Sequence, residues 1–360
     1  MVCRGIVETK IAMKIGVYNP YFDGLGGGER YTLTLASHWS EIHDVSLFWD
    51  DPNILSVSES RFGLDLSRVR VTPNVFKNGN IFEKLWASRK YDLLFFLSDG
   101  SIPMTLGRHN ILHFQVPFPS ILTDPWKMSR YDAVICNSQF TKDTIDAEVG
   151  LKAMVIYPPV PSIGFPKTVK KKKRILSVGR FTNYFQAKKQ EILIEAFKSI
   201  HEHRVTSDWE LVFAGGLMTS DEEYFMKLKT SAAGMPIQFF SNVSNDELTK
   251  LYQTSTIYWH AAGFGETNPI VMEHFGIATV EAMSAGVVPL VFAAGGQPEI
   301  VTDGVSGKLW TSEKELVDGT IALVTDAPKL KRFQKAAMAR SQVFSTERFT
   351  RAFDGLIAGW

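Results

Sequence analysis

The sequence predicts an α/β protein with two domains, each built on a parallel β-sheet that is covered by helices on both faces. Three observations lead to this fold class. The chain has 360 residues, the length of two ordinary domains. Short apolar runs alternate with helical stretches, as in parallel sheets, and this alternation occurs twice. A proline-rich segment over residues 157–166 divides the two halves.

The first half opens on an apolar run that a helical stretch over Glu29–Ser40 follows directly. The strands expected in this half are Ile15–Tyr18, Val45–Phe48, Leu93–Phe96, Asn110–Phe114 and Ala133–Cys136. Their alternation with helical segments predicts one parallel sheet for this half.

The second half repeats the pattern, with helical stretches over Gln190–Ile200 and Gly276–Ser284. The strands expected here are Ile175–Val178, Glu210–Ala214, Ile237–Phe239, Ile257–Trp259 and Val288–Phe292. A second parallel sheet follows from the same reasoning.

Prolines mark the junction between the halves, because they stiffen the chain and prevent regular strand pairing. They are Pro158, Pro159, Pro161 and Pro166, and a basic run over Lys167–Arg174 follows them. We place the linker near 158–172, the first domain at 1–160 and the second at 161–344. The last segment, Ser345–Trp360, reads as a helix with an apolar side made by Phe349, Phe353, Leu356 and Ile357.

Composition excludes several classes of protein. Lys and Arg total 39 against 38 for Asp and Glu, so net charge gives no drive towards nucleic acid. Cys3 and Cys136 have no His/Cys cluster around them, which argues against a disulfide framework and a zinc site. No apolar run reaches the roughly 18–20 residues of a membrane span, and Met1–Lys10 lacks a signal-peptide core. A cytoplasmic protein is expected, and peripheral membrane contact stays open.

A glycine-rich turn, Gly24-Leu25-Gly26-Gly27-Gly28-Glu29-Arg30, lies between the first strand and its helix. Glycines let the backbone approach a ligand closely, and N–H groups at a helix start attract anions. A generic tight turn is the alternative. A dinucleotide site would also need an acidic residue roughly 20 residues on, and Asp50 and Asp51 do follow a strand.

A second candidate site is Ser177-Val178-Gly179-Arg180, followed by Lys188-Lys189-Gln190. Here a strand ends, a loop follows and a helix begins near Gln190. The loop lies at the carboxyl end of a strand, where α/β proteins bind ligands. Arg180 and Lys188 suit a diphosphate, and we expect both on an exposed loop. Solvated surface charge is the alternative.

The third candidate places two carboxylates, Glu273 and Glu281, with seven residues between them, around a helix start at Gly276. The amides of Gly276 and Ile277 would point out of that start, between the two carboxylates. A carboxylate also accepts hydrogen bonds from sugar hydroxyls. Two surface glutamates are the alternative, although Ala282-Met283-Ser284-Ala285-Gly286 indicates a tightly packed helix.

These segments, in this order, resemble glycosyltransferase family 4, retaining enzymes of GT-B fold in which two Rossmann-like domains face each other across a cleft. The resemblance covers nearly the whole chain. It rests on the early Gly-Gly-Gly-Glu, the Val-Gly-Arg and Lys pair, Phe213-Ala214-Gly215-Gly216, the block from Glu273 to Glu281, and Gly295-Gly296-Gln297-Pro298-Glu299-Ile300-Val301.

The resemblance implies a role for each matching position. Arg180 and Lys188 would hold the donor diphosphate, Glu281 the ribose and Glu273 the transferred hexose. Other positions would surround the donor: Gly27, Gly28, Gly215, Phe275, Gly276 and Ile277. The first domain would then bind the acceptor and the second the donor, with the last helix crossing back to the first.

His113 matches the histidine that lines the reacting sugar in the family, although a strand-end histidine is as often structural. Spacing to the next helix favours Lys188 over Lys189 as the phosphate ligand. The segment Ala261–Met272 is longer than is usual in the family and reads as a loop beside the donor sugar. It holds the secondary candidates His260 and Glu266.

The implied function is transfer of a hexose, mannose first, from a GDP- or UDP-sugar to a glycan or lipid-linked acceptor, without metal or other cofactor. The Glu273–Glu281 block most resembles mannosyltransferases that extend lipid-linked oligosaccharides on the cytosolic face. Three alternatives are a nicotinamide-dependent oxidoreductase, a sugar-nucleotide epimerase and a non-catalytic carbohydrate-binding relative. The mixed apolar and basic stretch Phe76–Trp86 lies on a membrane surface or, as we favour, packs its apolar face on the sheet.

Overall fold

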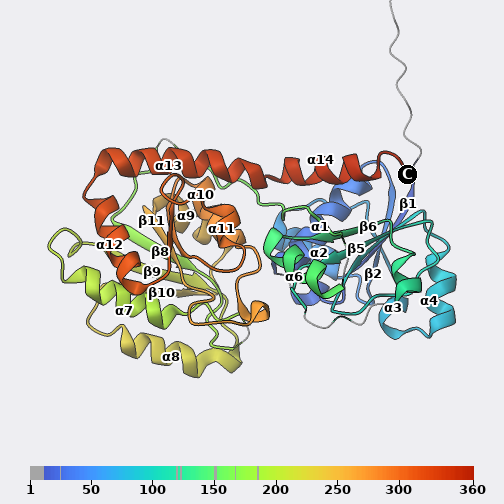
Figure 1. Cartoon of the computed structure of the whole chain (residues 1–360), viewed down its shortest axis with the longest axis horizontal. Helices are drawn as coiled ribbons and strands as arrows, with labels where there is room; N and C mark the ends of the chain where they lie inside the picture. Colours follow the sequence, from blue (N-terminus) through green and yellow to red (C-terminus); the bar gives the residue numbers. More distant parts are fainter. Residues whose placement is uncertain are drawn as a thin grey trace, which may run out of the picture.

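A computed structural model describes residues 12–360 except 25, 119–120, 122–123, 150–151, 167 and 185. The expectation for Met1–Lys10 therefore lies outside the described residues. The chain forms two α/β halves that lie end to end (Figure 1). Each half has its own parallel sheet, as the sequence predicts.

The N-terminal half holds a seven-stranded sheet in the order β3-β2-β1-β4-β5-β6-β7. Its strands are β1 (Lys14–Tyr18), β2 (Asp44–Phe48), β3 (Arg70–Thr72), β4 (Leu93–Leu97), β5 (His109–Phe114), β6 (Ala133–Cys136) and β7 (Met154–Val155). Its helices are α1 (Gly27–Ser40), α2 (Ile54–Phe62), α3 (Val75–Asn78), α4 (Ile81–Ser88), α5 (Pro125–Met128) and α6 (Gln139–Val149).

The C-terminal half holds a six-stranded sheet in the order β10-β9-β8-β11-β12-β13. Its strands are β8 (Arg174–Val178), β9 (Glu210–Gly215), β10 (Ile237–Ser241), β11 (Ile257–His260), β12 (Val288–Phe292) and β13 (Lys308–Trp310). The helices from here on are α7 (Gln190–His201), α8 (Glu222–Ser231), α9 (Asn245–Thr254), α10 (Ile277–Ser284), α11 (Gln297–Ile300), α12 (Glu313–Val324), α13 (Ala327–Ser341) and α14 (Thr346–Ile357).

Every strand expected from an apolar run is a strand in the structure. Three further strands had no such signal: β3, β7 and β13, which hold two or three residues each and form edges of the sheets. An edge strand this short has too few buried positions to produce an apolar run. The register is regular, with Ile15 of β1 facing Val45 of β2 and Leu93 of β4.

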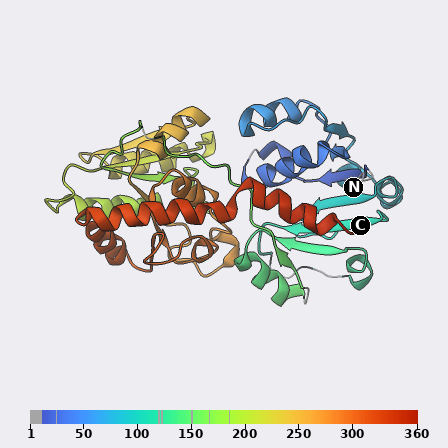
Figure 2. The ribbon, with the colours of Figure 1, turned by 90° about the horizontal axis from the view of Figure 1, so that it is seen from above.

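Two chain segments connect the halves, and they lie side by side. Val160, in the proline-rich linker, forms a parallel bridge with Ser345, and its N–H donates to the carbonyl of Phe344 at 3.0 Å. Beyond this point α14 packs Phe349 and Phe353 into the core of the N-terminal half. Helices α13 and α14 thus run along both halves, as Figure 2 shows from above.

The expected packing of Phe76–Trp86 is only partly right. Phe76, in α3, is buried against the sheet. Helix α4, by contrast, turns three of its apolar residues outward: Ile81 is 42% exposed, Phe82 79% and Trp86 67%. The favoured interpretation is therefore wrong for α4, because a capped turn at Asn80 separates it from α3 and resets which face meets the sheet.

Candidate functional site

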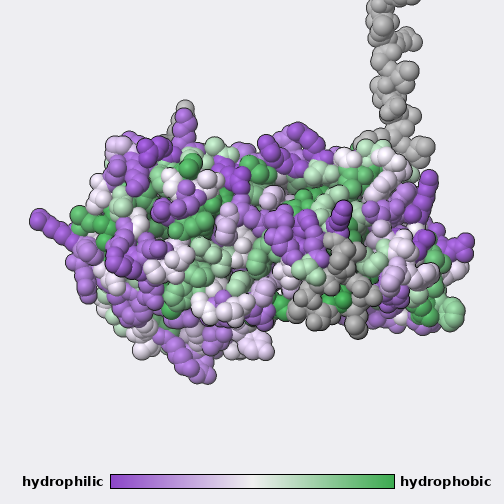
Figure 3. All heavy atoms as spheres, viewed as in Figure 1, coloured by the Kyte–Doolittle hydropathy of each residue, from purple (hydrophilic) through white to green (hydrophobic). Residues whose placement is uncertain are grey.

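A cleft of about 480 Å³ lies between the two halves, and the outline of the molecule is indented between them (Figure 3). It lies where loops leave the carboxyl ends of strands in both sheets, the usual ligand side of such sheets. Its lining residues are Gly26, Gly27, Arg30, Arg61, Phe62, Val178, Gly179, Arg180, Gly215, Gly216, Asn242, Val243, Asn245, Leu248, Ile277, Ala278 and Glu281. Three arginines and one carboxylate favour an anionic ligand.

Two helices begin at this cleft from opposite sides. Helix α1 begins at Gly27 and α10 at Ile277. They approach so closely that a Cβ on Gly27 would lie 2.8 Å from Cδ1 of Ile277. The N–H groups of a first helical turn have no partner within the helix and carry partial positive charge. Together the two helix starts add to the attraction of the arginines for an anion.

The loop with Arg180 depends on a close backbone approach. A Cβ on Gly215 would lie 1.9 Å from the carbonyl oxygen of Gly179, so only glycine fits there. The N–H of Gly179 donates to Ala214, and that of Phe181 to Gly216, each at 2.9 Å. These bonds hold the exposed Arg180 at the cleft.

Lys188, which the sequence predicts on an exposed loop, is mostly buried in the structure. Its ammonium lies 2.6 Å from Oε2 of Glu273, and the two side chains are only 14% and 18% exposed. Nε2 of His260 lies 3.0 Å from the same oxygen. Burial raises the pKa of the Glu273 carboxyl, but Lys188 and His260 outweigh it and hold that pKa well below its usual range. Glu273 is therefore charged, and Lys188 compensates it.

Glu281 also has partners, although it faces the cleft. Its Oε1 accepts from Nη1 of Arg30 at 2.9 Å, and its Oε2 from the hydroxyl of Tyr252 at 3.0 Å. Arg30 belongs to the other half of the molecule. Burial, followed by the charge of Glu281, raises the pKa of Tyr252 well above its usual value, so this hydroxyl stays a neutral donor.

The segment between Glu273 and Glu281 contains and packs against glycines, because the backbone approaches its neighbours too closely there for a side chain. Gly276 has φ +122°, and a Cβ there would lie 2.4 Å from Nε2 of Gln297. A Cβ on Gly295 would lie 2.0 Å from the carbonyl oxygen of Glu273. Phe275 points into the core. The Gly-Gly-Gln-Pro-Glu segment of the sequence thus supports the start of α10.

His113 is buried in the N-terminal half and is not among the residues that line the cleft. Its ring is completely buried and stacked on Tyr31 at 4.1 Å between centroids. Nδ1 lies 3.1 Å from the carbonyl oxygen of Ile135, and Nε2 lies 3.1 Å from Nε2 of Gln115. Burial lowers the pKa of His113 to about 3, so the ring is neutral and donates to that carbonyl. Its assignment to the reacting sugar stays a prediction. Gln115, which lies at Nε2 of His113, also donates to the carbonyl oxygen of Gly28 at 3.5 Å.

The loop Ala261–Met272 is attached to the start of α7. Lys189 pairs with Glu266 at 2.6 Å, while Lys188 pairs with Glu273. The neighbouring lysines thus point to different carboxylates, and only Lys188 reaches the glutamate at the candidate site. His274 adds a further tie, with Nε2 lying 2.9 Å from the carbonyl oxygen of Ile270.

The structure brings together most of the residues that the sequence indicates. Gly27, Arg180, Gly215, Ile277 and Glu281 line the cleft. Lys188, Glu273 and His260 form a buried network, and His113 and Gly28 meet at Gln115. The sequence reasoning missed Arg30, Arg61 and Tyr252. Arg30 was inside a quoted motif, but no local signal shows that it reaches Glu281.

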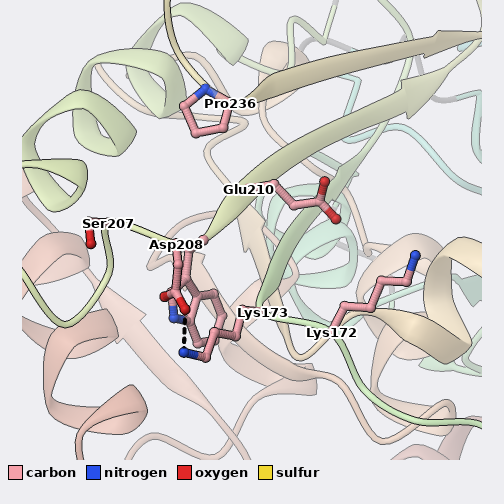
Figure 4. Close-up of a pocket in the computed structure, with 7 residues that line it drawn as sticks. Lys172, Lys173, Ser207, Asp208, Glu210 and Pro236 are labelled. Carbon is pink, nitrogen blue, oxygen red and sulfur yellow. Dashed lines mark hydrogen bonds and ion pairs between the residues drawn. The ribbon is translucent and has the colours of Figure 1, made fainter.

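A second pocket, of about 410 Å³, lies at the amino-terminal ends of the strands of the C-terminal sheet (Figure 4). Lys173 pairs there with Asp208 at 2.5 Å, and Glu210 pairs with Arg174 at 2.6 Å. These two ion pairs compensate the charges of Lys173, Asp208 and Glu210, and the pocket lies at the amino ends of β8 and β9, away from the usual ligand side. In the described part of the chain, no group of three or more His, Cys, Asp or Glu residues is placed to hold a metal.

Two family models match the chain in succession. Residues 25–162 match Glycosyltransferase Family 4, and residues 163–340 match Glycosyl transferases group 1. The boundary between the two matches falls in the proline-rich linker.

Among curated proteins, the chain is similar to the GDP-Man:Man(3)GlcNAc(2)-PP-Dol alpha-1,2-mannosyltransferase of Mus musculus, with 28% identity over 62% of this chain and 47% of the relative. It is also similar to Alpha-1,3/1,6-mannosyltransferase ALG2 of Homo sapiens, with 25% identity over 73% of this chain and 67% of the relative. The chain spans about half the length of the alpha-1,2-mannosyltransferases that it matches.

Solved structures share the whole fold. Anabaena Alr3699/HepE, in complex with UDP and glucose, has a TM-score of 0.71 at 18% identity and covers 97% of this chain and 100% of its own. A glycosyltransferase from Rickettsia africae has a TM-score of 0.74 at 16% identity over 96% of this chain and 97% of its own. At this level of identity the likeness concerns the arrangement of the two halves.

Proposed function

Because this chain belongs to glycosyltransferase family 4, whose two domain models match residues 25–162 and 163–340, we propose that it transfers a hexose from a nucleoside-diphosphate sugar to an acceptor hydroxyl with retention of anomeric configuration. One observation carries the proposal: a cleft between the carboxyl edges of two parallel sheets presents three arginines and one carboxylate. A diphosphate and a ribose are the two groups that such a lining suits.

The leaving diphosphate needs its growing negative charge stabilised while the bond to the anomeric carbon breaks. Arg180 and the starts of α1 and α10 supply fixed positive potential at the cleft, with no reorganisation during the reaction. Glu281 accepts the ribose hydroxyls, and Glu273 accepts the hydroxyls of the hexose. Lys188 keeps Glu273 charged, and we propose that its ammonium also faces the diphosphate.

We propose mannose as the sugar and GDP as the nucleotide. Support comes from the named relatives, a GDP-mannose-dependent mannosyltransferase of a dolichol-linked oligosaccharide and a second mannosyltransferase. A lipid-linked glycan is then the acceptor. The test is a thermal-shift screen of GDP-, UDP-, ADP- and dTDP-sugars, followed by transfer of the selected sugar and determination of the anomer formed. A bound ligand raises stability by mass action.

Each alternative gives a different result in that assay. An epimerase converts the nucleotide sugar without releasing the nucleoside diphosphate. An oxidoreductase changes nicotinamide absorbance, and a non-catalytic relative binds the donor without turnover. An inverted product in the transfer assay would overturn the retaining assignment alone.

We further propose that no metal takes part, because Arg180 and the helix starts occupy the role that a divalent ion has in metal-dependent transferases. Transfer should therefore persist within about twofold in excess EDTA. The measurement is the initial rate of diphosphate release with and without chelator. Loss of transfer on chelation, with recovery on adding Mg²⁺ or Mn²⁺, would contradict this leaving-group account.

A lipid-linked acceptor requires the protein to reach a membrane surface, and we propose that α4 is the contact. It lies at the end of the N-terminal half farthest from the C-terminal half (Figure 1), where hydrophobic and hydrophilic residues lie side by side on the surface (Figure 3). Phe82 and Trp86 are exposed, and Lys90 lies 3.6 Å above the Trp86 ring. Exposed aromatics beside basic groups suit an anionic bilayer surface. No helix in the part of the chain described is long and apolar enough to cross a bilayer.

The double variant Phe82→Ser, Trp86→Ser should bind vesicles with anionic lipid roughly tenfold more weakly, since two side chains no longer enter the interface. Co-sedimentation with vesicles of phosphatidylcholine and phosphatidylserine measures this. Met226→Ser, at a 57% exposed position of α8 in the other half, is the matched control and should bind as before. Equal vesicle binding by the double variant would place the membrane contact elsewhere.

A further inference from the structure

Arg30, from the N-terminal half, contacts Glu281, which belongs to the C-terminal half and is the one carboxylate among the residues that line the cleft. It lies in the first turn of α1, and its Nη1 reaches Oε1 of Glu281 at 2.9 Å. The side chains are 21% and 15% exposed, so the pair is largely shielded from solvent. The guanidinium also lies 5.4 Å from the centre of the Phe62 ring, which restricts its movement. Arg30 is thus held in place from its own half.

The carboxylate of Glu281 keeps room for a ligand in this arrangement. Arg30 occupies one lone pair of Oε1, and the buried Tyr252 hydroxyl occupies one of Oε2. An ionised carboxylate has about four lone-pair sites, so about two remain. Two neighbouring hydroxyls of a ribose need that number. Arg30 and Tyr252 therefore fix the carboxylate from both ends without saturating it.

We propose that Arg30 is a positioning residue for the nucleotide ribose, acting across the cleft through Glu281. The inference rests on the proposed function, because it takes the ribose as the ligand of Glu281. Through Arg30, the N-terminal half contributes to recognition of the nucleotide, although Arg30 itself does not touch the ribose. A charged carboxylate clamped by a guanidinium loses less conformational freedom when the ribose binds, so affinity rises.

The alternative is that Arg30 takes the place of the ribose and must leave before the nucleotide binds. The two alternatives predict opposite signs. Removal of a positioning residue weakens nucleotide binding, whereas removal of a competitor strengthens it.

The experiment is isothermal titration of the full chain with GDP and UDP, each compared with its 2′,3′-dideoxy analogue. The unmodified protein should prefer the ribonucleotide. Arg30→Ala should weaken binding of the ribonucleotide roughly tenfold more than binding of the dideoxy analogue, the size of a coupling between contacting groups, because the dideoxy analogue loses only the general attraction of one cleft cation. Arg30→Lys should keep part of the preference, because its ammonium still compensates Glu281.

Arg61→Ala is the matched control. It removes a guanidinium from the same half and the same cleft, but Arg61 hydrogen-bonds Asn245 at 3.2 Å and, among the described residues, pairs with no carboxylate. Its loss should weaken both members of each nucleotide pair equally, through charge alone. Glu281→Gln should lose the ribose preference, and adding Arg30→Ala to it should have little further effect.

The outcomes separate this inference from the function on which it rests. If the unmodified protein binds ribo- and dideoxynucleotides equally, or binds neither diphosphate, the assignment of Glu281 fails and so does this inference. If Glu281→Gln loses the preference while Arg30→Ala keeps it, only the role of Arg30 is overturned. Tighter binding by Arg30→Ala would show that Arg30 competes with the ribose.

Discussion

Replacing Lys188 by alanine should lower transfer at least a hundredfold and reduce the free energy of unfolding by about 3 kcal/mol. The two effects share a cause. The Lys188 ammonium lies 2.6 Å from Glu273, and both side chains are mostly buried. Without it, the buried Glu273 carboxylate keeps its contact with His260 but loses the ammonium that compensates its charge. Urea unfolding and the rate of diphosphate release measure the two effects separately.

A double variant separates stability from catalysis. Lys188→Met with Glu273→Gln leaves no uncompensated charge, so it should recover most of the lost stability. It should remain inactive, because both polar groups are gone from the site. If Lys188→Ala unfolds at the urea concentration of the unmodified protein, the buried ion pair does not contribute to the fold as argued.

Replacing Arg180 by alanine should lower transfer about a hundredfold, the order expected for removing one preorganised electrostatic group. The free energy of unfolding should change by less than about 0.5 kcal/mol, because Arg180 is exposed at the cleft. Steady-state kinetics with the donor identified by the screen, together with urea unfolding, test this. The contrast with Lys188 is the informative result: two cations of one motif differ in what they do for the fold.

Two further variants make this result specific. Arg180→Lys should retain part of the rate, since it keeps the charge but loses the planar fork that matches a phosphate. Lys173→Ala removes a 60% exposed cation at the amino end of β8, whereas Arg180 follows its carboxyl end, and transfer should be unchanged. A normal rate in Arg180→Ala would remove Arg180 from the diphosphate site.

Local patterns in the sequence were sufficient for the fold class and for the positions of the central strands. Apolar runs such as Ala133–Cys136 and Val288–Phe292 coincide with β6 and β12, because a strand covered on both faces must be apolar along its length. The helix start between Glu273 and Glu281 was also predictable. Gly276 precedes α10 with a positive φ that favours glycine, and a helix boundary is a local property of the chain.

Only the tertiary structure decided which charges meet. Arg30 and Glu281 are 251 residues apart in the chain, and their pairing depends on how two separate sheets are placed across the cleft. The different partners of Lys188 and Lys189, and the burial of His113 against Tyr31, likewise depend on neighbours from other elements. The residue types were visible in the sequence, because chemistry belongs to the side chain. Their partners were not, because a contact between distant segments is fixed by packing of the whole chain and leaves no periodic pattern in either segment.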